Sequence, residues 1–264
     1  MKFLKPIVNR RLRLLAAALM VGTMLLDVVV LEIRYLIPDT VRPNDSNFVN
    51  NPEGNGAVLE RLAAQSGQPC DIIFIGASNV EYWDTEGKPV WDHYYAPRHA
   101  FNFGVAGDKT ENVLWRFDHM NLSRLKPKVA VVFVGLNNLL YATPREVVMG
   151  VKAISQKTRS VFPGIKVIVV SLTPNWRDNG EVVQANKILR AYADNKNIFY
   201  VDIYSHMPPE GDNWKGLKPD HLHFTEGGYE MWAEQMEPLM QKLISPLPSD
   251  SAAAITVPDQ AQIK

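Results

Sequence analysis

The chain has little cysteine and no excess of either charge: Cys70 is its one cysteine, and 28 Lys and Arg stand against 28 Asp and Glu. A single cysteine excludes an intramolecular disulfide framework and a metal site built from several thiolates. A net charge of zero gives no electrostatic reason to expect nucleic acid as a partner. With 46% hydrophobic and 21% charged residues, the chain is neither wholly disordered nor a polytopic membrane protein. The composition favours one globular domain with tails.

The N-terminus has its own pattern. The first 13 residues contain five basic residues and no acid, and an apolar run from Leu14 to Leu31 follows, interrupted by Asp27. A basic segment before an apolar run is typical of an export signal whose basic flank stays in the cytoplasm. No small-residue cleavage motif follows, so we expect residues 1–36 to form an uncleaved signal-anchor helix in the inner membrane, with the body in the periplasm or outside the cell. The alternatives are a cleaved signal, which would release a secreted protein, and an amphipathic helix packed on the globular domain.

Two further segments differ in composition from the rest of the chain. Residues 37–56 are rich in Pro, Asn and Asp, which predicts a linker. Residues 245–264 contain three Pro and no aromatic residue, which predicts a disordered tail. These bounds leave residues 57–244 for one domain.

Within that domain, short apolar runs alternate with helical patterns. The runs do not alternate apolar and polar residues, so they predict strands buried on both faces of a parallel sheet. They are residues 71–76, 101–104, 128–135, 166–172 and 198–202. The predicted helices are Thr110 to His119, Pro144 to Phe162 with Thr143 as N-cap, Gly180 to Asn195, and Glu226 to Leu243. This order predicts a doubly wound α/β sheet with right-handed crossovers.

Ligands bind such sheets beyond the carboxyl ends of the strands, where several reactive residue types occur. Ser78 follows the first strand through a small-residue turn that would expose its hydroxyl. Gly107 and Asn137 follow the next two strands and could donate hydrogen bonds to a developing oxyanion. Asp220 and His223 have a spacing that would place both on one face of a helical turn, where the carboxylate could orient the imidazole. Each residue also has a structural interpretation, as a helix cap or a turn residue, but together they predict a nucleophile, an oxyanion hole and an oriented base.

Other patterns have weaker functional interpretations. His221 and His223 could form a metal pair, although no cysteine or acidic cluster completes such a site. The loop from Gly104 to Thr110 looks superficially like a phosphate loop, but it reads Gly-Asp-Lys-Thr where Gly-Lys-Thr is needed. Four aromatic residues after the serine could stack on a sugar, line a pocket or pack in the core. They are Trp83, Trp91, Tyr94 and Tyr95.

At these residues the chain resembles the SGNH (GDSL-like) hydrolases, and among them the catalytic subunits of platelet-activating factor acetylhydrolase and their bacterial relatives. The matching stretches run from about Cys70 to Leu243 and are IIFIGASNV, FNFGVAGDKTENVLWRF, LKPKVAVVFVGLNN and PDHLHFTEGGYEMW. The resemblance implies a flavodoxin-like three-layer α/β/α sandwich with a mainly parallel sheet. Ala77 and Asn138 depart from the family pattern, in which Asp is usual.

The resemblance also implies a mechanism. Ser78 would be the nucleophile, His223 the general base, and Asp220 the residue that orients His223. The Ser78 and Gly107 N–H groups and the Asn137 side chain would form the oxyanion hole, and no cofactor or metal is implied. We therefore expect a serine esterase acting on a small-molecule, glycan or lipid ester. Because no long insertion builds an acyl pocket, short acyl groups are favoured, acetyl above all. The alternatives are a lysophospholipase or lipase, and a non-catalytic SGNH-like scaffold that binds glycan or a protein partner.

Overall fold

The computed structural model describes residues 20, 23–24, 37–174, 179–207 and 215–244. The chain divides into two units, residues 1–39 and residues 40–264, and the elements described below belong to the second. The anchor helix predicted for residues 1–36 and the tail predicted for residues 245–264 lie outside the described residues, apart from three N-terminal positions. In the described part of the chain, no helix combines the length and the hydrophobicity that crossing a bilayer requires.

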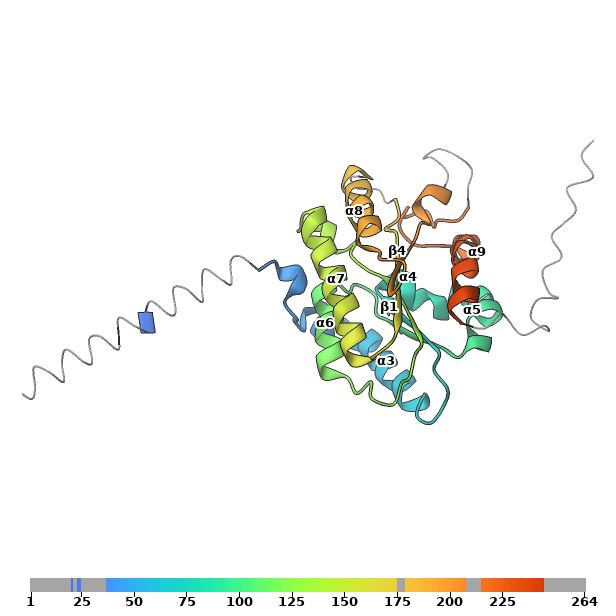
Figure 1. Ribbon diagram of the computed structural model, residues 1–264, viewed down its shortest axis with the longest axis horizontal. Helices are drawn as coiled ribbons and strands as arrows, with labels where there is room; N and C mark the ends of the chain where they lie inside the picture. Colours follow the sequence, from blue (N-terminus) through green and yellow to red (C-terminus); the bar gives the residue numbers. More distant parts are fainter. Residues whose placement is uncertain (1–19, 21–22, 25–36, 175–178, 208–214, 245–264) are drawn as a thin grey trace, which may run out of the picture. The chain divides into compact units, whose positions relative to one another are not determined.

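A parallel five-stranded sheet forms the centre of the second unit (Figure 1). Its strands are β1 (Ile72–Gly76), β2 (Ala100–Gly104), β3 (Val129–Phe133), β4 (Lys166–Val170) and β5 (Ile198–Val201). The order is β2-β1-β3-β4-β5, with every neighbouring pair parallel. Every residue of β1 and β3 is buried, which confirms the prediction from their uninterrupted apolar sequences. This is the flavodoxin-like strand order, in which ligands bind where the order reverses, between β1 and β3.

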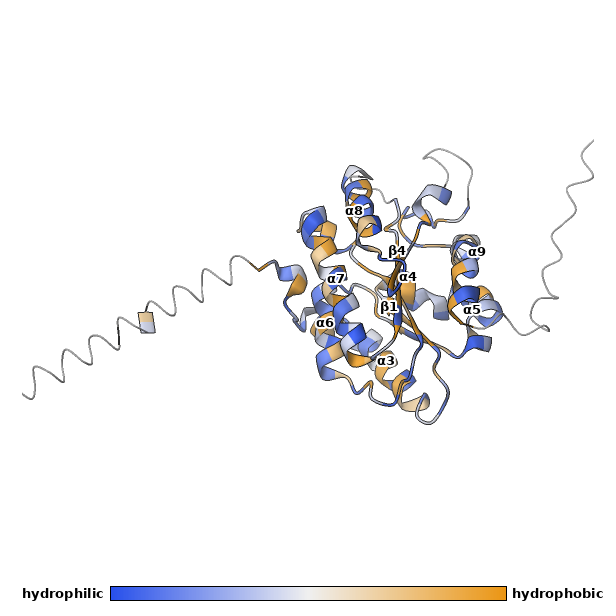
Figure 2. Cartoon of the chain, viewed as in Figure 1, coloured by the Kyte–Doolittle hydropathy of each residue, from blue (hydrophilic) through white to orange (hydrophobic). Residues whose placement is uncertain are grey.

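Helices cover both faces of the sheet, consistent with the expected three-layer arrangement (Figure 1). Three of them lie side by side on one face: α6 (Thr110–His119), α7 (Pro144–Val161) and α8 (Asn179–Tyr192). On the other face, α5 (Lys88–Tyr94) packs against α9 (Glu226–Leu243). These helices carry mixed hydrophilic and hydrophobic residues, as expected for elements that bury one side (Figure 2). The bounds of α6 and α9 agree with the sequence prediction.

The N-terminus of α7 shows why its position could be predicted. The Thr143 hydroxyl accepts a hydrogen bond from the Glu146 N–H (3.4 Å), and the Glu146 carboxylate accepts one from the Thr143 N–H (2.8 Å). Pro144 occupies the first helical position, where its missing N–H costs nothing. This reciprocal capping box confirms Thr143 as the N-cap.

The segment 37–56, expected to be a linker, is largely folded. It contains α2 (Ser46–Asn50) and the beginning of α3 (Pro52–Ala64). Asn51 caps α3 with its side-chain oxygen, which accepts a hydrogen bond from a backbone N–H of the first turn (3.0 Å). The compact unit therefore begins at Thr40, well before the predicted boundary at residue 57. The linker prediction is wrong for this part because Pro and Asn mark helix N-termini as well as linkers.

The four aromatic residues that follow the serine lie in the hydrophobic core. Trp83 and Tyr95 are at most 1% exposed, and Trp91 and Tyr94 at most 8%. Three of the rings contact Phe74 of β1, with centroid distances of 4.7 to 6.0 Å. The packing interpretation therefore holds, and these rings offer no surface on which a sugar could stack.

Candidate active site

Ser78 stands at a sharp turn between β1 and the short helix α4 (Ser78–Glu81). A Cβ atom on Gly76, at the end of β1, would lie 2.2 Å from the carbonyl oxygen of Phe133, so this turn requires glycine. Ser78 is the first residue of α4 and is partly exposed. Among the described residues, no group accepts a hydrogen bond from its N–H. The turn thus presents both the hydroxyl and the N–H of Ser78 at the carboxyl edge of the sheet.

The structure brings Ser78, His223 and Asp220 into one chain of hydrogen bonds. The Ser78 Oγ lies 2.9 Å from His223 Nε2, and His223 Nδ1 lies 2.7 Å from Asp220 Oδ2. If Nδ1 carries the proton, it donates to the carboxylate, and Nε2 is left to accept from the serine hydroxyl. This is the geometry that a nucleophile, a general base and its orienting group require.

Asp220 and His223 lie in a turn rather than on the helical turn that their spacing suggested. The turn follows Leu217, which forms an antiparallel bridge with Phe224. Asp220 Oδ1 accepts hydrogen bonds from the backbone N–H groups of Leu222 and His223, both at 2.9 Å. The helical-turn prediction is wrong because an aspartate that accepts these backbone bonds stabilises an Asx turn instead. One carboxylate oxygen therefore holds the turn and the other holds the imidazole.

The surroundings of Asp220 favour its charged form. Partial burial opposes ionisation, but hydrogen bonds from the His223 N–H, the imidazole and the Leu222 N–H outweigh it and lower the pKa of the carboxyl to about 2. The carboxyl thus stays ionised at any pH at which a serine hydrolase with a histidine base would work. A negative charge beside Nδ1 stabilises the imidazolium that forms when His223 takes a proton.

This lowered pKa predicts a pH dependence of stability. The pKa of Asp220 is about 2 in the folded protein and about 3.9 in the unfolded chain. The charged carboxylate therefore stabilises the fold fully above about pH 3.9, and this stabilisation is lost as the pH falls through about 2. We expect the difference in unfolding free energy between the wild type and Asp220→Asn to be constant above about pH 5 and to shrink toward pH 2. Urea unfolding at a series of pH values measures it. A difference that does not change with pH would contradict the prediction.

Asn79 fixes the histidine turn against α4, a role that the sequence reasoning missed. Its side chain is 4% exposed, donates to the Leu222 carbonyl (3.1 Å) and accepts from the Phe224 N–H (3.3 Å). The Tyr229 hydroxyl donates to the Asn79 carbonyl (3.0 Å). Asn79 therefore ties the segments that carry Ser78 and His223 together. Its position next to Ser78, within a matched motif, was the available signal.

The two other predicted oxyanion donors lie on neighbouring loops. Gly107 is exposed and has a φ of +82°, and no described residue accepts from its N–H. The Asn137 amide donates one hydrogen bond to the carbonyl of Asp108 (2.9 Å). An amide nitrogen carries two N–H groups, so a second donor remains on Asn137. Both residues thus keep a free donor, as an oxyanion hole requires.

The structure accounts for Asn138, one of the two departures from the family pattern, and offers no explanation for the other, Ala77. Asn138 is buried; its side-chain oxygen accepts from the Thr110 N–H (3.0 Å), and its nitrogen donates to the Glu111 carboxylate (2.8 Å). An ionised aspartate could not make the second bond, because it has no N–H to donate. Ala77 precedes α4 without a side-chain cap and lines a pocket beside Ser78.

That pocket lies at the carboxyl ends of β1, β3 and β4. Its volume is about 20 Å³, and its wall is mostly apolar: Phe133, Val134, Leu136, Leu172 and Leu222. Ser78 and Asn137 also line it, so it opens directly beside the reactive hydroxyl. An apolar pocket of this size can take one small hydrophobic group.

The metal-pair interpretation of His221 and His223 does not fit this geometry. Both ring nitrogens of His223 already contact Ser78 and Asp220, which leaves neither free for a metal. His221 is exposed and its φ of 54° lies in the left-handed region. Within the described ranges, no three His, Cys, Asp or Glu side chains are grouped in a way that could hold a metal ion.

The chain is similar to several known proteins. Residues 74–231 match the GDSL-like lipase/acylhydrolase family. The platelet-activating factor acetylhydrolase IB subunit alpha2 of Rattus norvegicus is 32% identical over 192 residues, which cover 70% of this chain and 82% of the relative. The alpha1 subunit of the same organism is 29% identical over 223 residues, covering 81% and 94%. A crystal structure of a GDSL-like lipase from Bacteroides thetaiotaomicron has a TM-score of 0.57 and 21% identity, covering 70% and 98% of the two chains.

Proposed function

The chain belongs to the GDSL-like lipase/acylhydrolase family and is an ester hydrolase, and from this premise we propose that it acts through an acyl-enzyme on Ser78 and prefers short acyl groups. The observation that carries the proposal is the continuous chain of hydrogen bonds from the Ser78 hydroxyl through His223 to Asp220. A serine hydroxyl is a weak nucleophile until a base accepts its proton, and this chain supplies the base.

In the proposed mechanism, His223 Nε2 takes the proton of the Ser78 hydroxyl as Oγ attacks the ester carbonyl carbon. The carbonyl oxygen becomes an oxyanion, which accepts hydrogen bonds from the Ser78 and Gly107 N–H groups and the Asn137 amide. His223 then gives its proton to the leaving alcohol. A water activated by His223 attacks the acyl-enzyme, the carboxylic acid leaves, and Ser78 regains its proton. Each oxyanion donor contributes about 3 kcal/mol to stabilising the transition state.

The preference for short acyl groups is supported by the pocket beside Ser78. A pocket of about 20 Å³ has room for the methyl group of an acetyl ester, and most of a fatty acyl chain would lie outside it. The relatives are named as acetylhydrolases, in agreement with a small acyl group. We therefore propose acetyl esters as substrates, with an alcohol part that extends into solvent.

Leu222 offers a test of this preference because it lines the pocket and lies between Asp220 and His223. We expect Leu222→Ala to raise the butyrate-to-acetate ratio of kcat/KM by about tenfold, since one or two methylene groups in an apolar pocket change binding by that order. p-Nitrophenyl esters from acetyl to palmitoyl measure it. Leu59→Ala, at a leucine 46% exposed on α3, is the matched control and should leave the ratio unchanged.

The same ester series separates the proposal from its alternatives. Wild-type kcat/KM should peak at acetyl. A peak at long chains would instead indicate a lysophospholipase or lipase. If no ester is hydrolysed in a Ser78-dependent way and a fluorophosphonate probe does not label Ser78, the binding-scaffold interpretation replaces the esterase.

We also propose that residues 1–36 hold the protein in a membrane with the hydrolase domain outside the cytoplasm. The support is the basic segment followed by the apolar run from Leu14 to Leu31. Membrane fractionation with externally added protease tests this. A full-length chain in the membrane fraction whose domain is digested from outside would agree, whereas a chain in the cytoplasmic fraction would contradict it.

A further inference from the structure

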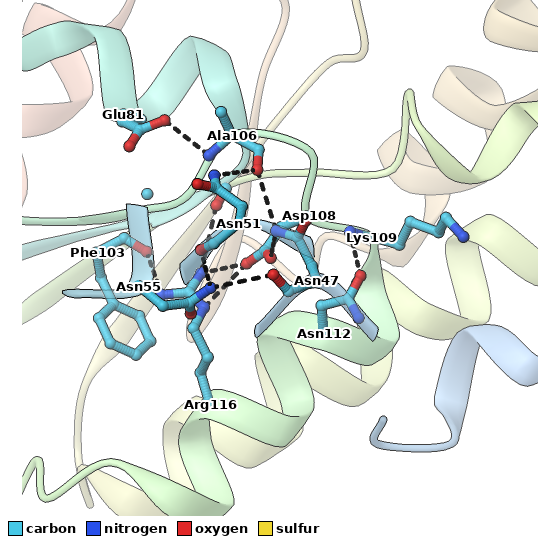
Figure 3. A network of polar contacts seen from close by, with 12 residues as sticks. Asn47, Asn51, Asn55, Glu81, Phe103, Ala106, Asp108, Lys109, Asn112 and Arg116 are labelled. Atoms are coloured by element: carbon cyan, nitrogen blue, oxygen red, sulfur yellow. Dashed lines mark hydrogen bonds and ion pairs between the residues drawn. The ribbon is translucent and has the colours of Figure 1, made fainter. Parts of the chain in front are cut away.

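The loop that carries Gly107 is anchored by a buried ion pair. Asp108 and Arg116 are each 1% exposed, and Arg116 Nε and Nη2 donate to Asp108 Oδ2 at 2.9 and 2.6 Å. Arg116 Nη1 also donates to the carbonyl of Phe103 in β2 (2.8 Å). Figure 3 shows this pair at the centre of a polar network beneath the loop. The inner side of the loop is therefore fixed to the end of the sheet.

The outer side of the loop is held by α2, from the segment expected to be a linker. Asn47 is 9% exposed, and its side-chain nitrogen donates to Asp108 Oδ1 (2.6 Å) and to the carbonyl of Ala106 (3.0 Å). Figure 3 shows Asn47 reaching the loop from α2. These two bonds bracket Gly107, and a Cβ atom on Gly107 would lie 3.0 Å from the Asn47 side-chain oxygen. One amide thus contacts the loop on both sides of the proposed oxyanion donor.

Asp108 also contacts Asn137, the other proposed oxyanion donor. The carbonyl of Asp108 accepts from the Asn137 amide, while its carboxylate accepts from Asn47 and Arg116. A shift of Asp108 would therefore move both Gly107 and Asn137 relative to Ser78. We propose that Asn47 is a positioning residue for ester hydrolysis, which holds the Gly107 N–H and, through Asp108, the Asn137 amide where the oxyanion forms. This inference rests on the proposed function.

An asparagine suits this position for a physical reason. Its amide can donate to the carboxylate of Asp108, whereas an aspartate at residue 47 would face that carboxylate with a second negative charge. Burial raises the pKa of the Asp108 carboxyl, and Arg116 and the Asn47 amide oppose this rise. The Asn47 amide therefore favours the charged form of Asp108, the carboxylate that pairs with Arg116 and fixes the Gly107 loop.

The chain contains a matched control for Asn47. Asn55 is 1% exposed in the neighbouring helix α3, and its side chain donates to the carbonyls of Asn47 (3.3 Å) and Asn51 (2.9 Å). It supports the same two helices but makes no described hydrogen bond to the Gly107 loop. Replacing either asparagine removes a buried amide, and only the change at Asn47 removes contacts to the oxyanion loop.

The test compares Asn47→Ala and Asn55→Ala in the full-length protein. We expect Asn47→Ala to lower kcat for p-nitrophenyl acetate by about 10-fold to 100-fold with KM within about twofold, because displaced oxyanion donors weaken transition-state binding without weakening ground-state binding. Asn55→Ala should keep kcat within about twofold of the wild-type value, even if it lowers Tm by as much as Asn47→Ala does. Equal losses of kcat in both variants, or no loss in Asn47→Ala, would overturn the proposal.

Amide hydrogen exchange of residues 104–110 gives a readout that does not require ester hydrolysis. We expect faster exchange in this loop for Asn47→Ala and unchanged exchange for Asn55→Ala, measured below the Tm of both. If the wild type hydrolyses no ester, the proposed function fails, yet the exchange still shows whether Asn47 fixes the loop. Unchanged exchange in Asn47→Ala would overturn the positioning role by itself.

Discussion

Ser78→Ala is expected to lower kcat for p-nitrophenyl acetate by at least about 10⁴-fold, the largest effect of any single change proposed for this chain. Without the hydroxyl, no acyl-enzyme forms. His223 and the oxyanion donors can then catalyse only a slow, direct attack of water on the ester. The measurement is steady-state hydrolysis together with fluorophosphonate labelling, and both should be lost. The fold should be kept, because the Ser78 side chain makes no described hydrogen bond except the one with His223.

Ser205→Ala is the control for this variant. Ser205 is exposed, and its described hydrogen bond is donated by its backbone N–H to Asp202, which alanine preserves. Its kcat should match the wild type. If Ser78→Ala instead keeps more than about a tenth of the wild-type kcat, Ser78 is not the nucleophile and the mechanism is wrong.

Asp220→Asn should lower kcat by about 10³-fold to 10⁴-fold, as the same change does in serine proteases. The asparagine Oδ1 can still accept from the Leu222 and His223 N–H groups, so the turn can form. Its Nδ2, however, is a donor facing His223 Nδ1, which drives the imidazole proton to Nε2. That nitrogen can then no longer accept the Ser78 proton. Kinetics with p-nitrophenyl acetate and thermal unfolding separate this loss from misfolding.

A second turn-capping aspartate controls for the structural part of this effect. Asp194 Oδ1 accepts hydrogen bonds from the backbone N–H groups of residues 196, 197 and 198, and these bonds lower its pKa to about 2. Asp194→Asn should change kcat by less than about twofold, because this turn holds no imidazole. If Asp220→Asn lowers kcat no more than Asp194→Asn does, Asp220 caps a turn and does not orient His223.

Local sequence patterns predicted much of this molecule. The five strands were found because residues buried on both faces of a parallel sheet are apolar without alternation. The start of α7 was found from Thr143 and Pro144, whose preferences at a helix N-terminus arise within one turn. Ser78, Gly107 and Asn137 could be predicted as one site because each follows a strand end, and parallel strands place those ends at one edge of the sheet.

Other features depended on contacts that no local pattern encodes. The Ser78–His223 bond joins residues 145 positions apart, and the Asn47–Asp108 bond joins residues 61 positions apart. The asparagines of residues 37–56 matched a linker in composition, and packing against the Gly107 loop made Asn47 a buried contact. The spacing of Asp220 and His223 fitted a helix, and backbone hydrogen bonds to the carboxylate produced a turn.

Local sequence signals were enough to predict the five strands, four of the helices and the residue types at the strand ends, because propensity, capping and burial act over a few neighbouring positions. Which of those residues meet, and which side chains hold them, depends on how distant segments pack. A hydrogen bond between distant segments depends on how whole elements pack, and its geometry is satisfied or lost within tenths of an ångström. For this hydrolase, the proposed reacting groups could be named from the sequence, whereas the contacts of Asn47 and Asn79 that hold their loops could be recognised only in the fold.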